Sequence, residues 1–343
     1  MEEFKILKDL VKFNTIKDKE NKEIIDYIEN YLKGYGFKTE YKSKDLVMSI
    51  GENQSLGFLG HTDTVEYIEE FKNPFDLAEK GEELYGLGSC DMKGGIAAML
   101  DAVSKIDFTK LKSGMKLFFT YDEEIGFGGA YEIVEKKIKI PKTMIFGEPT
   151  NNEILTGSKG LLEYEIYFKG LKAHSSNPEK GISANLNAVK FLNELNEFYE
   201  SKIKCDKVSV YEIPYTTMNV GLINGGSAKN SVPASCEVSI DFRLADVKHL
   251  NKIVTKIDSL ALKYSAEAKI IEKIEPFFDN FEFLEENKTA GFMTEASIIK
   301  GCDQRIILGV GPVTAHEVNE HITKESYRKL VEQYKELIYR FCK

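Results

Sequence analysis

Two histidines and several carboxylates follow short apolar segments of this 343-residue chain, and side chains of these types could bind metal ions. The pattern begins with Gly-His-Thr-Asp-Thr at residues 60–64, where His61 and Asp63 come directly after an apolar run. Imidazole is a good zinc ligand, and a nearby carboxylate can orient its ring. A single His-x-Asp pair is more often a polar strand end than a metal site. The metal hypothesis therefore depends on the recurrence of the pattern.

Acids or a histidine follow four further segments that are expected to be strands or turns. These residues are Asp91, Glu123, Glu124, Glu148 and His316. Ligands of open α/β sheets bind beyond the carboxyl ends of the strands, so we expect these side chains to meet at one edge. So much negative charge in one place is costly unless a cation neutralises it. Mixed nitrogen and oxygen ligands suit Zn²⁺, with Co²⁺ or Mn²⁺ as alternatives.

The candidate ligands outnumber those that one zinc ion needs. Two metal ions about 3.5–4 Å apart, bridged by one carboxylate and a water, would use all of them. Asp91 precedes Lys-Gly-Gly, and a tight turn there could hold a bridging carboxylate rigidly. Glu123 and Glu124 are adjacent, so they cannot both bind one ion without strain. One of them can bind metal while the other accepts a proton from water, as in general-base catalysis of amide hydrolysis.

Strands that alternate with helices are expected to position these residues. Apolar residues at helical spacing predict helices at 2–13, 20–33, 93–103 and 128–135, and Thr323 is expected to cap a last amphipathic helix. Apolar runs predict strands at 38–41, 46–50, 56–60, 115–121, 143–147 and 305–309. The alternation indicates an α/β domain with a mixed, mostly parallel sheet flanked by helices.

A different pattern occupies residues 158–274. It predicts strands at 161–169, 216–224, 234–243 and 268–274, and helices at 183–198 and 247–264. The β-α-β-β-α-β order is that of a ferredoxin-like domain. We therefore expect a discontinuous catalytic domain, residues 1–157 and 275–343, interrupted by an inserted α+β domain, residues 158–274.

Composition argues against several classes of protein. The net charge of -9 disfavours a nucleic-acid partner, which requires clustered Lys and Arg. No run of 18 apolar residues is present, so no membrane span is expected. The five cysteines form no Cys-x-x-Cys pair, and the N-terminus has no apolar run typical of a signal peptide. Reduced thiols and a cytoplasmic location are therefore expected.

Five motifs, in order along the chain, resemble those of the zinc-dependent amidohydrolases and peptidases that include acetylornithine deacetylase, succinyl-diaminopimelate desuccinylase and the aminoacylases. They are Gly-His-Thr-Asp-Thr-Val at 60–65, Gly-Leu-Gly-Ser-Cys-Asp-Met-Lys-Gly-Gly at 86–95, Asp-Glu-Glu at 122–124, Gly-Glu-Pro-Thr at 147–150 and Ala-His-Glu at 315–317. The resemblance covers essentially the whole chain. It implies a zinc-exopeptidase-like fold with two Zn²⁺ per subunit.

The resemblance also implies a role for each residue of the cluster. A first metal would be held by His61 and Glu148 and a second by Glu124 and His316, with Asp91 bridging the two. In the same way, Glu123 would be the general base, and Asp63 would orient His61. The Asp91–Met92 peptide would be cis, as it is in the family.

The inserted domain carries three further candidates. His174 resembles a family histidine that crosses a dimer interface and stabilises the oxyanion, which implies a homodimer through this domain. The alternative is a loop histidine with local hydrogen bonds. Asn230 and Arg243 resemble positions that hold a substrate carboxylate, a task that suits the guanidinium fork. For Arg243 the alternative is a strand-end ion pair with Asp241 or Asp246.

The choice of substrate depends on residues 291–296. This segment resembles the Cys-Thr-Glu-Ala segment of acetylornithine deacetylases, and Glu295 would receive the ammonium of the substrate's side chain. The alternative is a solvent-facing acid in a loop. The sequence thus predicts a two-metal hydrolase of N-acyl amino acids, with deacetylation of N-acetylornithine in arginine biosynthesis favoured. A succinyl-diaminopimelate desuccinylase, a metallo-dipeptidase or carboxypeptidase, and a non-catalytic metal-binding interaction protein are the alternatives.

Overall fold

A sheet whose central strands are parallel lies in the first of two units into which the chain divides. The computed structural model describes residues 3–16, 20–67 and 70–343. Unit 1 comprises Met1–Thr156, Asp279–Asn287 and Thr294–Lys343, and unit 2 comprises Gly157–Phe278 and Lys288–Met293.

The central strands of the unit 1 sheet run in the same direction. Across the sheet their order is β6 (Met115–Thr120), β3 (Leu56–His61), β7 (Thr143–Phe146) and β15 (Gln304–Ile307). β2 (Leu46–Ile50) pairs antiparallel with β6, β1 (Lys38–Lys42) with β2, and Leu155 of β8 (Leu155–Ser158) with β15. Every residue of β3 and of β6 is buried, as is usual for strands covered on both faces. The predicted α/β class is confirmed.

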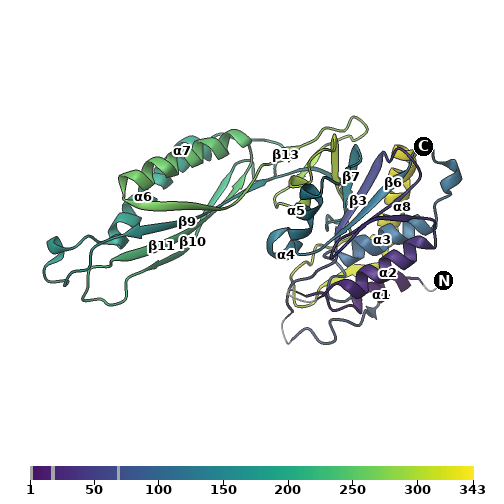
Figure 1. Cartoon of the computed structure of the whole chain (residues 1–343), viewed down its shortest axis with the longest axis horizontal. Coiled ribbons are helices and arrows are strands. Elements are labelled where there is room, and N and C mark those ends of the chain that lie inside the picture. The colour runs from purple at the N-terminus through teal and green to yellow at the C-terminus, as the bar shows by residue number, and fades with distance from the viewer. Residues whose placement is uncertain (1–2, 17–19, 68–69) are drawn as a thin grey trace. The chain divides into compact units, whose positions relative to one another are not determined.

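Helices cover both faces of this sheet (Figure 1). One set consists of α1 (Lys5–Val11), α2 (Lys22–Lys33), α3 (Lys93–Ser104) and α8 (Lys324–Cys342), whose buried residues join those of the sheet in one core. Successive strand residues point to opposite faces, so Phe58 lies in that core while Leu59 is buried on the opposite face of the sheet. Helix α5 (Gly128–Glu135) covers that opposite face (Figure 1). Thr323 caps α8 by accepting a hydrogen bond from the Ser326 N–H, as predicted.

Helix α1 is shorter than the predicted 2–13, and Glu2 lies outside the described residues. A small sheet in unit 1 was not predicted. It consists of β4 (Ala78–Lys80), β5 (Glu83–Tyr85) and β16 (His321–Thr323). Its strands are short and largely polar, so they have no apolar alternation by which to recognise them.

Unit 2 has the predicted β-α-β-β-α-β order. Its elements are β9 (Gly160–Lys169), α6 (Ala184–Phe198), β10 (Thr217–Gly225), β11 (Ser235–Leu244), α7 (Val247–Lys263) and β12 (Ala266–Ile274). The sheet is antiparallel, in the order β10-β11-β9-β12. Alternate residues of β9, such as Tyr164 and Ile166, are buried in a core with α6 and α7. The short strands β13 (Phe277–Phe278) and β14 (Lys288–Ala290) also belong to unit 2.

Within residues 3–16, 20–67 and 70–343, no helix has both the length and the apolarity that crossing a membrane requires.

Candidate metal centre

The ends of three neighbouring strands of unit 1 carry candidate ligands. His61 is the last residue of β3, and Glu148 follows β7 after Gly147. Glu123 and Glu124 begin α4 (Glu123–Gly126), which follows β6. The neighbours of β3 on both sides are parallel to it, so all these side chains leave the sheet at the same edge. Sequence order alone predicts this part of the arrangement.

Asp91 and His316 come from loops and join the same cluster. Asp91 lies before α3, and its peptide bond to Met92 is cis, as expected. Its Oδ1 lies 3.1 Å from His61 Nε2, and its Oδ2 lies 3.6 Å from His316 Nε2. His316 Nε2 is also 3.1 Å from Glu124 Oε2. One carboxylate thus reaches both histidines with different oxygens, which is the arrangement that a bridging ligand requires.

The cluster divides into overlapping sets of potential ligand atoms. Among the described residues, His61, Asp91 and Glu148 form one set, and Asp91, Glu124 and His316 form another, with the ligand atoms of each set within 4.8 Å of one another. Asp91 belongs to both sets. A further set combines His61 with Glu123 and Glu124. The structure therefore brings together all five predicted ligands and the predicted general base.

The acids of this cluster carry an electrostatic cost. Burial, and then the charge of Asp91, raise the pKa of Glu148 well above its ordinary value. Burial, and then the charge of Glu148, do the same to the pKa of Glu123. Hydrogen bonding to Asp91 and to Glu124 raises the pKa of His316 to about 10. The metal-free site thus favours bound protons, because their positive charge offsets the repulsion among the buried acids. A metal cation could offset the same repulsion.

The donor set fits divalent metal ions. Histidine nitrogen and carboxylate oxygen are ligands that zinc, cobalt and manganese accept. Glu124 Oε1 is buried and has no hydrogen-bond partner among the described residues, so an atom able to coordinate is left unsatisfied. A buried polar atom in this state is costly unless something binds it. The chemistry and the geometry of the cluster are those that a site for a divalent metal ion requires.

Asp63 links two parts of the cluster. Its Oδ2 accepts a hydrogen bond of 3.1 Å from the Glu124 N–H, and its Oδ1 lies 3.5 Å from His61 Nδ1. The carbonyl oxygen of Asp63 is closer to the same ring nitrogen, at 3.1 Å. Backbone and carboxylate of Asp63 therefore both face His61, and the carboxylate also holds the start of α4.

Close packing beneath the site fixes the start of α3. A Cβ on Gly94 would lie 2.1 Å from the Ser89 carbonyl oxygen, and one on Gly95 would lie 2.3 Å from that of Gly147. Only glycine allows the first turn of α3 to approach both segments so closely. The Gly-Gly pair after Asp91 thus lets α3 pack directly under the loops that carry the candidate ligands.

The three candidates of unit 2 do not all lie together. His174 bridges to Ser231, and Asn230 accepts a hydrogen bond from the Ser175 N–H, so His174 and Asn230 lie on adjoining segments. His174 Nδ1 lies 2.8 Å from Ser176 Oγ, the local hydrogen bond of the alternative interpretation. Arg243 is near the other end of β11. Its Nε donates to Asp241 Oδ1 at 3.1 Å, which is the strand-end ion pair that was its alternative.

Glu295 is not the solvent-facing acid of its alternative interpretation, because only 1% of its surface is exposed. Thr120 Oγ1 donates a hydrogen bond of 3.0 Å to Glu295 Oε2, while Oε1 is buried without a partner among the described residues. Burial raises the pKa of Glu295 to about 8. The sequence could not reveal this burial, because the neighbouring residues look like a loop.

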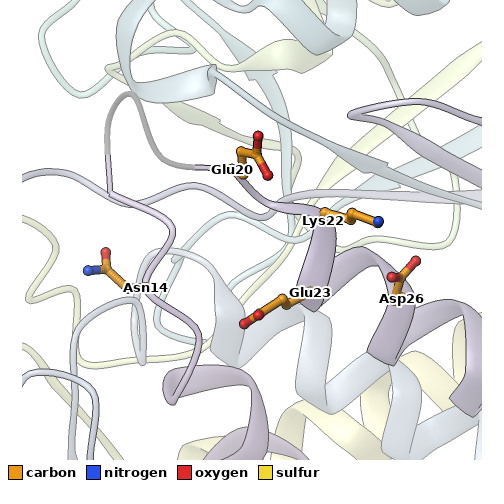
Figure 2. Close-up of a pocket in the computed structure, with 5 residues that line it drawn as sticks. All are labelled: Asn14, Glu20, Lys22, Glu23 and Asp26. Carbon is orange, nitrogen blue, oxygen red and sulfur yellow. The ribbon is translucent and has the colours of Figure 1, made fainter.

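A residue that was not predicted also touches the centre. Glu320 accepts hydrogen bonds from backbone N–H groups of the loop that carries Asp91. The sequence offered a weak signal, since Glu320 closely follows His316. The open pocket of about 480 Å³ in Figure 2 lies elsewhere, at the start of α2, and none of its lining residues is a candidate ligand. They are Asn14, Glu20, Lys22, Glu23 and Asp26.

Comparison with known proteins agrees with this geometry. The sequence profile of peptidase family M20/M25/M40 matches residues 57–340. Acetylornithine deacetylase from Pasteurella multocida is 31% identical over an alignment 363 positions long, which covers 95% of this chain and 92% of that protein. The chain belongs to peptidase family M20/M25/M40. The family resemblance of the five motifs is confirmed, and this M20 protein is a hydrolase that acts on amide bonds.

Solved structures of M20 proteins share its fold. An M20 metallo-carboxypeptidase from Sulfolobus solfataricus superimposes with a TM-score of 0.78 at 20% identity and covers 99% of both chains. A dinuclear metal-binding M20 peptidase from Bacillus subtilis superimposes with a TM-score of 0.72 at 13% identity, covering 98% of this chain and 96% of its own. At such identities the comparison concerns the fold alone.

Proposed function

We propose that this M20 hydrolase uses two Zn²⁺ ions to deacylate an N-acyl amino acid, with N-acetylornithine as substrate. The observation that carries the proposal is the position of Asp91, whose two carboxylate oxygens face His61 and His316. His61, Glu148 and Asp91 would hold the first ion, and Glu124, His316 and Asp91 the second. Co²⁺ and Mn²⁺ suit the same ligands.

The metals, when bound, would polarise the amide carbonyl and make water a better nucleophile. Glu123 would take a proton from the attacking water and return it to the leaving amine. Its position supports this role, because Glu123 lies beside His61 and Glu124 without belonging to either three-residue set that contains Asp91.

The assignment of substrate rests on similarity to named relatives and on Glu295. The relative from Pasteurella multocida is an acetylornithine deacetylase. Glu295 Oε1 is a buried acceptor without a partner among the described residues, and an ammonium group of the substrate would satisfy it. Succinyl-diaminopimelate desuccinylase, dipeptidase and carboxypeptidase activities are the alternatives within the family.

Unit 2 supports a homodimer as the active form. Arg243 pairs with Leu161 at one end of the sheet, while His174 bridges to Ser231 beyond the other end. From Ser235 to Arg243 the strand β11 spans roughly 26 Å at about 3.3 Å per residue. The two side chains of one copy cannot contact the same small substrate. If both act, one of them must come from a second copy of the chain.

Exposed apolar residues of unit 2 offer a surface for such a partner. Leu186 and Val189 of α6 and Leu222 and Ile223 of β10 are each more than half exposed. β10 is also an edge strand of its sheet, with backbone groups available for pairing. Light scattering of the full chain tests the dimer. A monomer with full activity would contradict the shared site.

Kinetic comparison of N-acetylornithine with N-succinyl-diaminopimelate and with a dipeptide on the zinc-loaded chain tests the substrate. We expect the highest kcat/KM for N-acetylornithine. Glu123→Gln tests the mechanism: it should retain both metals while kcat falls by about 10²–10⁴-fold, the usual contribution of general acid–base catalysis. Near-normal turnover by metal-loaded Glu123→Gln would refute the mechanism. Metal binding without hydrolysis of any of these substrates would favour the non-catalytic alternative.

A further inference from the structure

Glu320 lies beside the metal centre but has no part in the chemistry described above. Its exposed fraction is 2%. Its Oε2 accepts a hydrogen bond of 2.7 Å from the Gly88 N–H. Its Oε1 accepts one of 2.8 Å from the Cys90 N–H and one of 2.9 Å from the Asp91 N–H. A single buried carboxylate thus satisfies three backbone donors of the loop that ends in Asp91.

The backbone around Glu320 is tied to the same loop. The Gly86 N–H donates to the Glu320 carbonyl oxygen at 3.2 Å. The next residue, His321, pairs with Tyr85 where β16 meets β5. The segment that supplies His316 is therefore fastened to the segment that supplies Asp91, and the Glu320 side chain lies at the junction.

We propose that Glu320 is a positioning residue of the metal centre, which fixes the backbone of Asp91 so that both of its carboxylate oxygens reach their metal ions. The inference rests on the proposed two-metal function. A terminal ligand can follow a small backbone shift by rotating its side chain. A bridging carboxylate is restrained at both oxygens, so a shift that favours one ion moves the other oxygen away from its ion.

Substitution of Glu320 should therefore act on the metals and on turnover. In Glu320→Gln, an amide NH₂ would face at least one of the N–H donors that a carboxylate oxygen now accepts. Residues that orient metal ligands typically contribute about 10–100-fold to metal affinity or activity. We expect at least one ion to bind about 10–100-fold more weakly and kcat to fall by a similar factor. KM should change little, because Glu320 is not placed to contact substrate.

The experiment uses the metal-free full chain and Co²⁺ as the probe. Calorimetric titration gives the affinity of each ion, and the visible absorption of Co²⁺ reports its coordination. Glu320→Asp keeps the charge and should recover part of the affinity that Glu320→Gln loses. Glu29→Gln is the matched control, since Glu29 is a buried acid of α2 that pairs with Lys42 and accepts a hydrogen bond from Thr39. It should bind two ions as the unmodified chain does.

Three outcomes would overturn the proposal. The first is a folded Glu320→Gln chain with unchanged Co²⁺ affinities and spectrum, which would make Glu320 a purely structural residue. The second is loss of the folded state in both Glu320 variants, which would show that the carboxylate is needed for folding rather than for positioning the ligand Asp91. The third is an unmodified chain that binds fewer than two ions. That result would refute the proposed function itself, and the positioning role with it.

Discussion

Asp63→Asn should weaken binding of the metal ion held by Glu124 and His316 more than binding of the ion held by His61 and Glu148. In the structure, the Glu124 N–H donates to Asp63 Oδ2 at 3.1 Å, while Oδ1 is 3.5 Å from His61 Nδ1. The carbonyl oxygen of Asp63 lies 3.1 Å from that ring nitrogen and is unaffected by the substitution. The orientation of His61 therefore survives, whereas the support of Glu124 is reduced.

The size of the effect follows from the hydrogen bond to Glu124. Burial alone would raise the pKa of Asp63, but the hydrogen bond and charge of His61 bring this pKa below its ordinary value, so Asp63 is ionised at neutral pH. A hydrogen bond to a charged group contributes about 1.5–3 kcal/mol. Since about 1.4 kcal/mol corresponds to a factor of ten, the ion bound by Glu124 should bind about 10–100-fold more weakly. The ion bound by His61 should change by less than about tenfold.

The assay is calorimetric titration of the metal-free chain with Zn²⁺ in two backgrounds. In the His316→Ala background, the titration of Asp63→Asn measures mainly the affinity for the ion held by His61 and Glu148. In the His61→Ala background, it measures mainly the affinity for the ion held by Glu124 and His316. Asp101→Asn is the control, because Asp101 pairs with Lys105 on α3 and is not a candidate ligand. A larger loss at the His61 ion than at the Glu124 ion would refute the reasoning, since it would mean that the carboxylate acts chiefly through the imidazole.

Three further predictions concern pH, substrate and stability. Chelation of the metals should lower the melting temperature more at pH 8 than at pH 6. The metal-free fold raises the pKa of Glu148 above 4.5 and that of His316 from 6.5 to about 10, so between pH 6 and pH 8 it retains protons that the unfolded chain has released. The metal-free fold therefore loses stability as the pH rises from 6 to 8. Calorimetry with and without chelator measures this, and a difference that does not vary with pH would contradict it. Glu295→Gln should raise KM for N-acetylornithine by about tenfold or more, because it removes an ion-paired contact of about 1.5–3 kcal/mol. It should leave KM unchanged for N-acetylalanine, whose side chain has no ammonium group. Equal changes of KM for both substrates would show that Glu295 does not recognise the ammonium group. Thr323→Ala should lower the free energy of unfolding of the part that contains α8 by about 1 kcal/mol, through loss of the cap to the Ser326 N–H, without changing KM. Urea denaturation checks the last prediction, and unchanged stability would show that water replaces the cap.

Local patterns in the sequence were sufficient to predict much of the metal centre. His61 ends a strand that is buried throughout, Glu148 closely follows a second such strand, and Glu124 a third. In a parallel sheet the ends of neighbouring strands meet at one edge, so strand order and residue type together bring these side chains into one place. The β-α-β-β-α-β order of unit 2 was equally accessible, because alternation along β9 and helical periodicity along α7 are local features.

Contacts between segments distant in sequence were not accessible in this way. The small sheet that joins β5 to β16 consists of short polar strands, so nothing in either segment indicates its partner. Glu295 is in a segment that looks like a loop, yet it is buried against Thr120 of β6. Glu320 is one of many acids in the chain, and only the fold brings three backbone N–H groups to its carboxylate.

The sequence by itself determined the kinds of ligand, their order along the chain and the edge of the sheet at which they gather, because strand ends and residue chemistry are local properties. The tertiary structure alone decided which oxygen of Asp91 faces which histidine and that Glu320 holds the loop of Asp91. These details depend on distances of a few ångströms between remote segments. Such distances are fixed by packing, which no local pattern in the sequence records.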